Sequence, residues 1–374
     1  MAPVAKAGLE DIVVANSRIC FIDGENGILV YRGYDIAELA ENATFEEVAY
    51  LLWHDRFPRR AELEELSERL VASRGLPDEM TPILQACARS ESPMAALRTA
   101  VSALALFDPD AEDNSPDANQ RKAIRLTSQA ATIVAAYDRL RKGKDPIPPV
   151  PKLSHAANFL YMLTGKMPDE MTARAFDVCL VLHAEHGFNA STFAARVTAS
   201  TQADMHSAIC SAIGTLKGPL NGGANTRVME MLHEIGKVER VEPYLREALA
   251  AKKRIMGFGH RVYHTLDPRA RFLKKFSEEL ATRAANPVWY EISREIEARM
   301  MELKGLNANV DFYSASTYYM MGIPHDLFTP VFAVARIAGW AAHVLEQMAD
   351  NRLIRPREEY IGPMGLKYVP IEKR

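Results

Sequence analysis

Two histidines three residues apart are the first side chains that could do chemistry, in the run His183-Ala-Glu-His186-Gly-Phe-Asn-Ala-Ser-Thr. If the preceding helix continues, both rings lie on one of its faces, a spacing that could ligate a metal. However, the run is not HExxH, and no cysteine or third histidine follows nearby to complete a zinc site. Polar groups at the end of an apolar helix fit a binding pocket better, and we predict no metal.

A glycine loop with flanking cations is the second group, in the run Arg254-Ile-Met-Gly-Phe-Gly-His260-Arg-Val-Tyr followed by Asp267-Pro-Arg269. Glycines around one phenylalanine commonly serve only tight turns. A histidine and several arginines so close together equally favour an anion site, because guanidinium groups bind carboxylate and phosphate with paired hydrogen bonds. The absence of a Walker A or GxGxxG pattern argues against nucleotide hydrolysis and hydride transfer.

Asp311 and Arg336 lie among apolar neighbours, and each has two interpretations. Asp311 is either a helix cap, which the local sequence favours, or a desolvated carboxylate whose pKa rises above about 3.9 toward that of a general base. Arg336 lies in an apolar helix predicted for residues 330–348, where an unpaired charge is costly. Taken alone, it favours a structural carboxylate partner over a substrate carboxylate.

The elements that must position these residues are nearly all helices. Residues 18–32 alternate apolar and polar side chains around Asp23-Gly24 and Asn26-Gly27, as a short β-hairpin does. The turn at 217–225, which contains Gly-Pro and Gly-Gly, ends a helix abruptly and is either a plain structural turn or a hinge. Helical periodicity covers roughly residues 44–53, 61–73, 79–88, 93–106, 119–142, 152–164, 169–184, 188–200, 203–217 and 225–236.

Length and composition set the protein class. A chain of 374 residues exceeds one ordinary core, so two domains are expected. The net charge of -3 indicates neither a nucleic-acid nor a membrane-surface partner. The four cysteines are far apart, which fits neither disulfides nor zinc. Because residues 1–10 lack a signal-peptide core and no apolar run reaches membrane-spanning length, we expect a cytoplasmic location.

Together these motifs, in this order, resemble the citrate synthase family across nearly the whole chain. The IDGENGILVYRG opening, the HAEHGFNAST run, the GPLNGGAN turn, GFGHRVY with DPR, and NVDFYS all match its motifs. The resemblance implies a mainly α-helical homodimer with a short N-terminal β-hairpin and an active-site cleft between two domains. The large domain would comprise residues 1–221 and 321–374, and the small domain residues 222–320. Closure of the cleft would exclude water from a reactive thioester.

The resemblance also implies roles for individual residues. Asp311 would take a proton from acetyl-coenzyme A, and His260 would polarise the oxaloacetate ketone. No cofactor would be bound, since the coenzyme A thioester is a substrate. Oxaloacetate would be bound by His186, His260, Arg269 and Arg336, with Arg355 supplied by the other subunit; coenzyme A would be bound by Ile255, Met256, Gly257, Phe258, Gly259, Lys304 and Asn309.

Two positions depart from the family pattern. His264 stands where the family usually has Lys or Arg, and the resemblance implies that one phosphate contact would be weaker. Asn221 stands where the family has a histidine that hydrogen-bonds the thioester carbonyl as the enol forms. Asparagine keeps an NH₂ donor but cannot become cationic, and loss of one such donor costs about 10²–10³ in rate.

Three activities therefore remain open. The first is citrate synthase, with turnover either normal or impaired by Asn221. The second is 2-methylcitrate synthase, which would use propionyl-coenzyme A with the same residues. The third is a silent member of the family that binds ligands or assembles without turnover. For all three, assembly of dimers into higher oligomers is left open.

Overall fold

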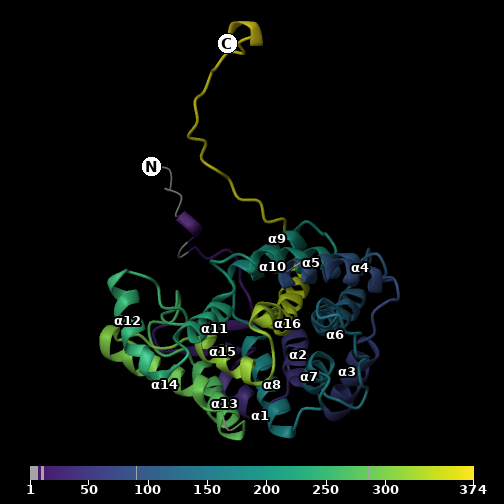
Figure 1. The fold of residues 1–374 in the computed structure, drawn as a ribbon. Coiled ribbons are helices and arrows are strands. Elements are labelled where there is room, and N and C mark those ends of the chain that lie inside the picture. The colour runs from purple at the N-terminus through teal and green to yellow at the C-terminus, as the bar shows by residue number, and fades with distance from the viewer. Residues whose placement is uncertain (1–6, 10–11, 90, 285) are drawn as a thin grey trace.

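The computed structural model describes residues 7–9, 12–89, 91–284 and 286–374. Most of residues 1–10, for which the sequence predicts no signal peptide, lie outside the described residues. The protein is mainly helical, as predicted (Figure 1). The α-helices are Ile36–Asn42 (α1), Phe45–His54 (α2), Arg60–Ala72 (α3), Met80–Cys87 (α4), Pro93–Leu104 (α5), Pro116–Arg141 (α6), His155–Thr164 (α7), Glu170–His183 (α8), Ala190–Ser200 (α9), Met205–Leu216 (α10), Ala224–Ile235 (α11), Val241–Ala250 (α12), Ala270–Arg283 (α13), Val288–Lys304 (α14), Val310–Met320 (α15) and Phe328–Ala349 (α16).

The N-terminal hairpin is part of a small antiparallel sheet in the order β1-β2-β3. Strand β1 (Cys20–Asp23) pairs with β2 (Ile28–Tyr31), and Asp23 faces Ile28 across the predicted turn. A third strand, β3 (Tyr34–Asp35), pairs with β2 and was not predicted. Two residues are too few to show an alternating pattern.

Local sequence explains where the predicted helices begin. Thr44 caps α2 in a capping box with Glu47, because each side chain accepts a hydrogen bond from the other residue's backbone N–H.

The turn between α10 and α11 needs its glycines. Gly223 has a φ of 77°, and a Cβ on Gly222 would lie 2.2 Å from the Leu216 carbonyl oxygen.

Helix α16 is the central element of the larger group of helices, packing against α2, α6, α8, α9 and α10. The stretch His325–Ala349 is long and apolar enough to cross a membrane by composition, but 94% of its apolar window is buried inside the protein. This burial identifies a core helix. Helices α11 to α15 gather on the opposite side of the molecule (Figure 1). The division into domains at residues 221 and 321 remains a prediction.

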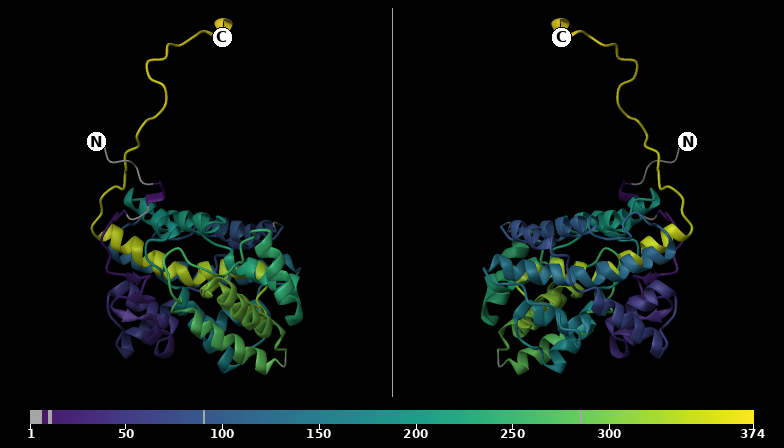
Figure 2. Two further views of the ribbon diagram at one scale, coloured as in Figure 1. Left: turned by 90° about the vertical axis from the view of Figure 1, so that its left-hand side faces the viewer. Right: turned by 90° about the vertical axis from the view of Figure 1, so that its right-hand side faces the viewer.

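The chain after α16 leaves the body as a long extended segment ending in a short 3-10 helix, Ile371–Lys373 (Figures 1 and 2). Its apolar side chains are exposed: Leu353, Tyr360, Ile361, Met364, Leu366, Tyr368, Val369 and Ile371. The start of this C-terminal segment, residues 350–374, hydrogen-bonds to Ser200 through Asn351 and Ile354 before the chain leaves the body. An apolar segment held away from its own core is typical of one that packs on another chain.

The tip of the hairpin lies against the loop that carries His260. A Cβ on Gly24 would lie 1.9 Å from the Val262 carbonyl oxygen, and the His264 N–H donates to the Gly24 carbonyl at 2.9 Å. Only glycine permits so close an approach of the two backbones. The first strands thus support a loop more than 200 residues later in the chain.

Candidate active site

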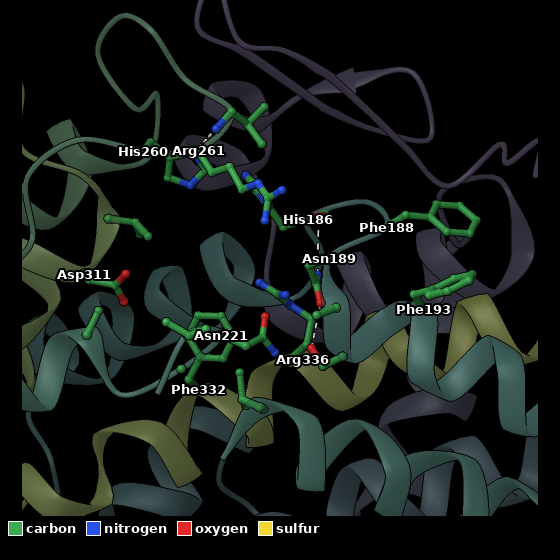
Figure 3. Close-up of a pocket in the computed structure, with 18 of the residues that line it drawn as sticks. His186, Phe188, Asn189, Phe193, Asn221, His260, Arg261, Asp311, Phe332 and Arg336 are labelled. Carbon is green, nitrogen blue, oxygen red and sulfur yellow. Dashed lines mark hydrogen bonds between the residues drawn. The ribbon is translucent and has the colours of Figure 1, made fainter. Parts of the chain in front are cut away.

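A cavity of about 790 Å³ brings together all but one of the residues predicted for catalysis and oxaloacetate binding (Figure 3). Its walls come from the N-terminal segment, the α8–α9 loop, the α10–α11 turn, the loop before α13, the start of α15, and α16. The predicted residues that line it are His186, Asn221, His260, Arg269, Asp311 and Arg336.

The two histidines of the first motif have different surroundings. Helix α8 ends at His183 and does not continue to His186, so the two rings do not share a helix face. His183 is fully buried, and its Nδ1 lies 2.7 Å from the Cys179 carbonyl oxygen. His186 lies in the following loop and reaches the cavity, with its Nε2 3.1 Å from the Tyr263 hydroxyl. Burial, then Arg269 and Arg336, hold the pKa of His186 well below its usual range, so the ring is neutral.

His260 faces the cavity as a neutral donor. Its Nδ1 accepts hydrogen bonds from the backbone N–H groups of Val262 at 3.0 Å and Tyr263 at 3.2 Å. Since Nδ1 accepts, the proton of the neutral ring resides on Nε2. Burial, with Arg269 second, lowers the pKa of His260 to about 4. At neutral pH the ring can therefore offer one N–H to a ligand oxygen.

Arg269 is held by an aspartate that also contacts the helix of Asp311. Asp267 accepts from Arg269 Nε and Nη2, both at 2.9 Å, and both side chains are buried. The same carboxylate accepts from the Val310 N–H at 3.0 Å, at the start of α15. Burial opposes the charge of Arg269, but the ion pair outweighs it and raises the pKa of the guanidinium. Arg269 is thus a fixed, permanent cation in the cavity wall.

Arg336 projects from the buried face of α16. Its Nε donates to the His183 carbonyl at 2.6 Å, and its guanidinium lies 4.5 Å from the centre of the Phe332 ring. Burial lowers the pKa of Arg336, and the charge of Glu185 is the largest opposing influence. Its direct hydrogen-bond partner is a carbonyl and not the structural carboxylate that the local sequence favoured. The remaining guanidinium N–H groups are available to a ligand anion.

Asp311 is a half-buried carboxylate and not the helix cap. The cap of α15 is Asn309, whose side chain accepts from the Asp311 N–H at 3.0 Å. Burial raises the pKa of Asp311 to about 6, although Arg269 and Arg336 act in the opposite direction. The desolvated interpretation of the sequence therefore describes this residue. A carboxylate of this pKa is mostly ionised at pH 7 and is a better base than an ordinary aspartate.

Asn221 lies in the α10–α11 turn and lines the same cavity (Figure 3). Its backbone N–H donates to the Gly218 carbonyl at 2.9 Å. Its side-chain Nδ2 is buried and has no hydrogen-bond partner among the described residues. An unpaired buried donor is costly, which marks this amide as a candidate to bind a ligand oxygen.

The predicted coenzyme A residues lie beside the cavity, not in its walls. The loop from Ile255 to Gly259 joins the start of α15, because the Asn309 N–H donates to the Gly257 carbonyl and the Asn309 side chain donates to the Gly259 carbonyl. Lys304 ends α14 and is exposed. Arg355 lies in the C-terminal segment, exposed and remote from the cavity of its own chain.

Sequence reasoning assigned no role to three residues that shape the site. Asp267 had a signal, since it lies two residues before Arg269. Tyr263 follows the glycine loop and contacts His186. Phe332 lies one helical turn before Arg336, a spacing that places both on one face. Among the described residues, no group of three His, Cys, Asp or Glu side chains is arranged to hold a metal ion.

Comparisons with known proteins show the family to which the chain is related. Residues 8–357 match the family model described as citrate synthase, C-terminal domain. The chain is 52% identical to the citrate synthase of Haloferax volcanii over the full length of both, and 51% identical to citrate synthase 2 of Bacillus subtilis over 99% of each. It is also 42% identical to a citrate/2-methylcitrate synthase of Bacillus subtilis over 95% of this chain and 96% of that one.

Solved structures share the whole fold. The citrate synthase of Pyrobaculum aerophilum superposes with a TM-score of 0.92 at 40% identity, over 98% of this chain and 95% of that one. The citrate synthase of Thermoplasma acidophilum gives a TM-score of 0.92 at 34% identity, over 98% of both chains. Since one family model and several relatives match nearly the full length, the chain belongs to the citrate synthase family.

Proposed function

We propose that the protein is a citrate synthase that condenses acetyl-coenzyme A with oxaloacetate and water to give citrate and coenzyme A. The observation that carries the proposal is one cavity holding a neutral N–H donor, His260, a carboxylate with a raised pKa, Asp311, and two buried arginines. Support for the ligands comes from the Thermoplasma acidophilum relative, which was solved with carboxymethyl coenzyme A and oxaloacetate.

The cationic wall suits a dicarboxylate. Arg269 and Arg336 are both buried in the cavity wall and provide planar donors for carboxylate oxygens. His186 is neutral and adds a hydrogen-bonding group without adding charge. In the proposed arrangement these residues bind oxaloacetate, and the Nε2–H of His260 donates to its ketone oxygen.

The reaction uses Asp311 as the base. Its carboxylate takes one proton from the acetyl methyl group, giving an enolate whose oxygen accepts a hydrogen bond from the Nδ2–H of Asn221. The enolate carbon then bonds to the oxaloacetate ketone carbon, whose oxygen gains charge and takes the Nε2 proton of His260, which water then replaces. Water hydrolyses the resulting citryl thioester and releases citrate and coenzyme A. Asn221 acts where charge develops, so its effect belongs mainly to the rate.

Coenzyme A would lie along the loop of residues 255–259 and the start of α15, with Lys304 and Asn309 at its edge. The backbone hydrogen bonds that join Gly257 to Asn309 support this placement, because they put the loop next to Asp311. His264 is exposed, 3.7 Å from Glu25, and offers a weaker phosphate contact than a lysine would.

A second copy of the chain would complete the site. Arg355 lies in the exposed C-terminal segment, whose apolar side chains have no cover in one chain. We infer that this segment packs on the partner of a homodimer and places Arg355 at the partner's oxaloacetate pocket. The large domain of residues 1–221 and 321–374 and the small domain of 222–320 would then close on the substrates.

2-Methylcitrate synthase is the second candidate, favoured by the 42% identity to a relative named citrate/2-methylcitrate synthase. The same residues would carry both reactions, since propionyl-coenzyme A differs by one methylene group. A pocket that discriminates one methylene does so by only about 10–200-fold.

Release of thiol from the acyl donor in the presence of oxaloacetate tests the proposal. We expect kcat/KM with acetyl-coenzyme A to exceed that with propionyl-coenzyme A, and the reverse order would identify 2-methylcitrate synthase. The variant Asn221→His should raise kcat by about 10²-fold or more, in line with recovery of a well-placed donor. Its Kd for oxaloacetate should change by less than about threefold. No thiol release from the parent and from Asn221→His would identify a silent member.

A further inference from the structure

Glu185 is a fully buried carboxylate directly behind the cavity, between His186 and the central helix α16. It does not line the cavity, and the proposed mechanism gives it no part. Its Oε1 accepts from the Gly187 N–H at 2.5 Å and lies 3.0 Å from His343 Nε2. Its Oε2 is buried and has no partner among the described residues.

The loop around Glu185 contacts one face of α16 at successive turns. The Arg336 side chain donates to the His183 carbonyl, and His343 faces the Glu185 carboxylate. Between them, a Cβ on Gly339 would lie 2.2 Å from the Ala184 carbonyl oxygen and 2.4 Å from Glu185 Oε2. Positions 336, 339 and 343 share a helix face, so the Glu185 carboxylate lies about one turn from Arg336.

The hydrogen bonds around His343 define the charge of the pair. His343 Nδ1 lies 3.2 Å from Arg196 Nη1, and a guanidinium has only donors. Nδ1 therefore accepts, Nε2 carries the proton, and the neutral ring donates to Glu185. Arg196 in turn donates to Glu346 Oε2 at 2.6 Å, at the outer end of the network. Glu185 Oε1 thus accepts from His343, and the neutral ring brings no positive charge to the carboxylate.

The turn that Glu185 holds is the one that points His186 into the cavity. Gly187 has a φ of 59°, and its N–H is bonded to the carboxylate across the intervening His186. The Tyr31 hydroxyl also donates to the Glu185 carbonyl at 2.7 Å. Side chain and backbone of Glu185 together fix the direction in which His186 leaves the chain.

We propose that Glu185 is a positioning residue: it holds the turn that directs His186 into the cavity, and its negative charge holds Arg336 in place while the cavity is empty. The inference rests on the proposed oxaloacetate pocket. In this arrangement a bound anion provides part of the negative charge that holds Arg336 in place, which Glu185 alone provides while the cavity is empty. The negative charge of Glu185 therefore weakens dianion binding, whereas its hydrogen bonds strengthen it.

Two variants separate the charge from the hydrogen bonds. Glu185→Gln keeps an oxygen for the Gly187 N–H and for His343 but removes the charge, so oxaloacetate should bind at least about threefold more tightly by titration calorimetry. Glu185→Ala removes the charge and the hydrogen bonds, so it should bind at least about tenfold more weakly than Glu185→Gln. Glu346→Gln, the same change at the outer end of the network, should bind within about twofold of the parent.

Unchanged or weaker binding by Glu185→Gln would overturn the charge role, and equal affinities of the two Glu185 variants would overturn the positioning role. If Glu185→Ala does not fold, Gly339→Ala takes its place, because the added methyl group displaces the same turn. It should then bind oxaloacetate at least about tenfold more weakly than Glu185→Gln. Failure of the parent to bind oxaloacetate would refute the proposed function instead. Crystals of the ligand-free Glu185→Ala variant decide positioning independently: we expect the 3.1 Å contact between His186 and Tyr263 to be lost, and an unmoved ring would refute it.

Discussion

The dependence of activity on pH tests the role of Asp311 most directly. The base must be ionised, and burial raises its pKa to about 6. It is then about nine-tenths ionised at pH 7 and about one-tenth ionised at pH 5, so kcat/KM should fall about tenfold between them. His260, with a pKa of about 4, stays mostly neutral over this range.

The measurement is the initial rate of thiol release with both substrates below their KM values, from pH 5 to pH 8. We expect an ascending limb with an inflection near pH 6. Asp311→Asn should lower kcat by about 10²-fold or more, the usual scale of general base catalysis. The pH profile of its residual rate should have no inflection near pH 6. Far-ultraviolet circular dichroism at pH 5 controls for unfolding. An inflection near pH 4, or one retained by Asp311→Asn, would refute the assignment.

The same carboxylate has a consequence for stability. Because its pKa is about 6 in the folded protein and 3.8 ordinarily, the folded state binds the proton more tightly. The stabilisation is complete below about pH 4 and is lost as pH rises through 6. At 1.36 kcal/mol per pKa unit, the loss is as much as about 3 kcal/mol. Asp311→Asn should therefore be more stable than the parent at pH 8 and not at pH 4, as judged by urea unfolding. The opposite order would contradict the burial argument.

Three further predictions concern other parts of the molecule. Burial and the neighbouring Glu46 raise the pKa of Asp177 to about 7, so the stability that its proton provides is lost as pH rises from about 4 to 7. The melting temperature of Asp177→Asn, measured relative to that of the parent, should therefore rise over that range. A constant difference between the two melting temperatures would contradict this. Gly24→Ala should lower kcat by about tenfold or more by displacing the Val262 carbonyl, while Gly75→Ala, where a Cβ meets nothing within 4 Å, should not; equal rates would show that the contact is not needed. If Arg355 acts in the partner's site, the inactive variants Arg355→Ala and Asp311→Asn should recover activity when they are refolded together. Half of the dimers are then mixed, and each mixed dimer has one intact site, so up to about one quarter of parental activity should return. No recovery would place Arg355 elsewhere.

The sequence predicted the helices well because their signals are local. Thr44 and Glu47 form the expected capping box, and α16 spans the apolar stretch expected for residues 330–348 to within two residues. The strand β3 was missed because its two residues carry no period. The helix predicted for residues 169–184 ends one residue earlier, at His183, so the continuation that a shared face for His183 and His186 required is absent.

The site was predictable in its residue types but not in its chemistry. Local sequence favoured a cap for Asp311, and it could not show that Asn309 already fills that role or that residues from distant segments bury the carboxylate. The tautomer of His260 depends on the backbone N–H groups of its own loop, which no spacing rule reveals. Glu185 gave no signal, because its partners lie on α16, more than 150 residues away.

The contact between the Gly24 turn and Val262 also constrains how the protein is made. The two residues are 238 positions apart, so a ribosome adding about 5–20 residues per second reaches the second roughly 12–48 s after the first. During that time the hairpin tip has no loop to support. Asp311 and Arg336 emerge later still. A nascent chain can therefore fold its early helices, but it has no complete pocket until nearly nine-tenths of it has been synthesised. A pause in synthesis before Val262 leaves the hairpin tip without the loop that it contacts in the folded protein.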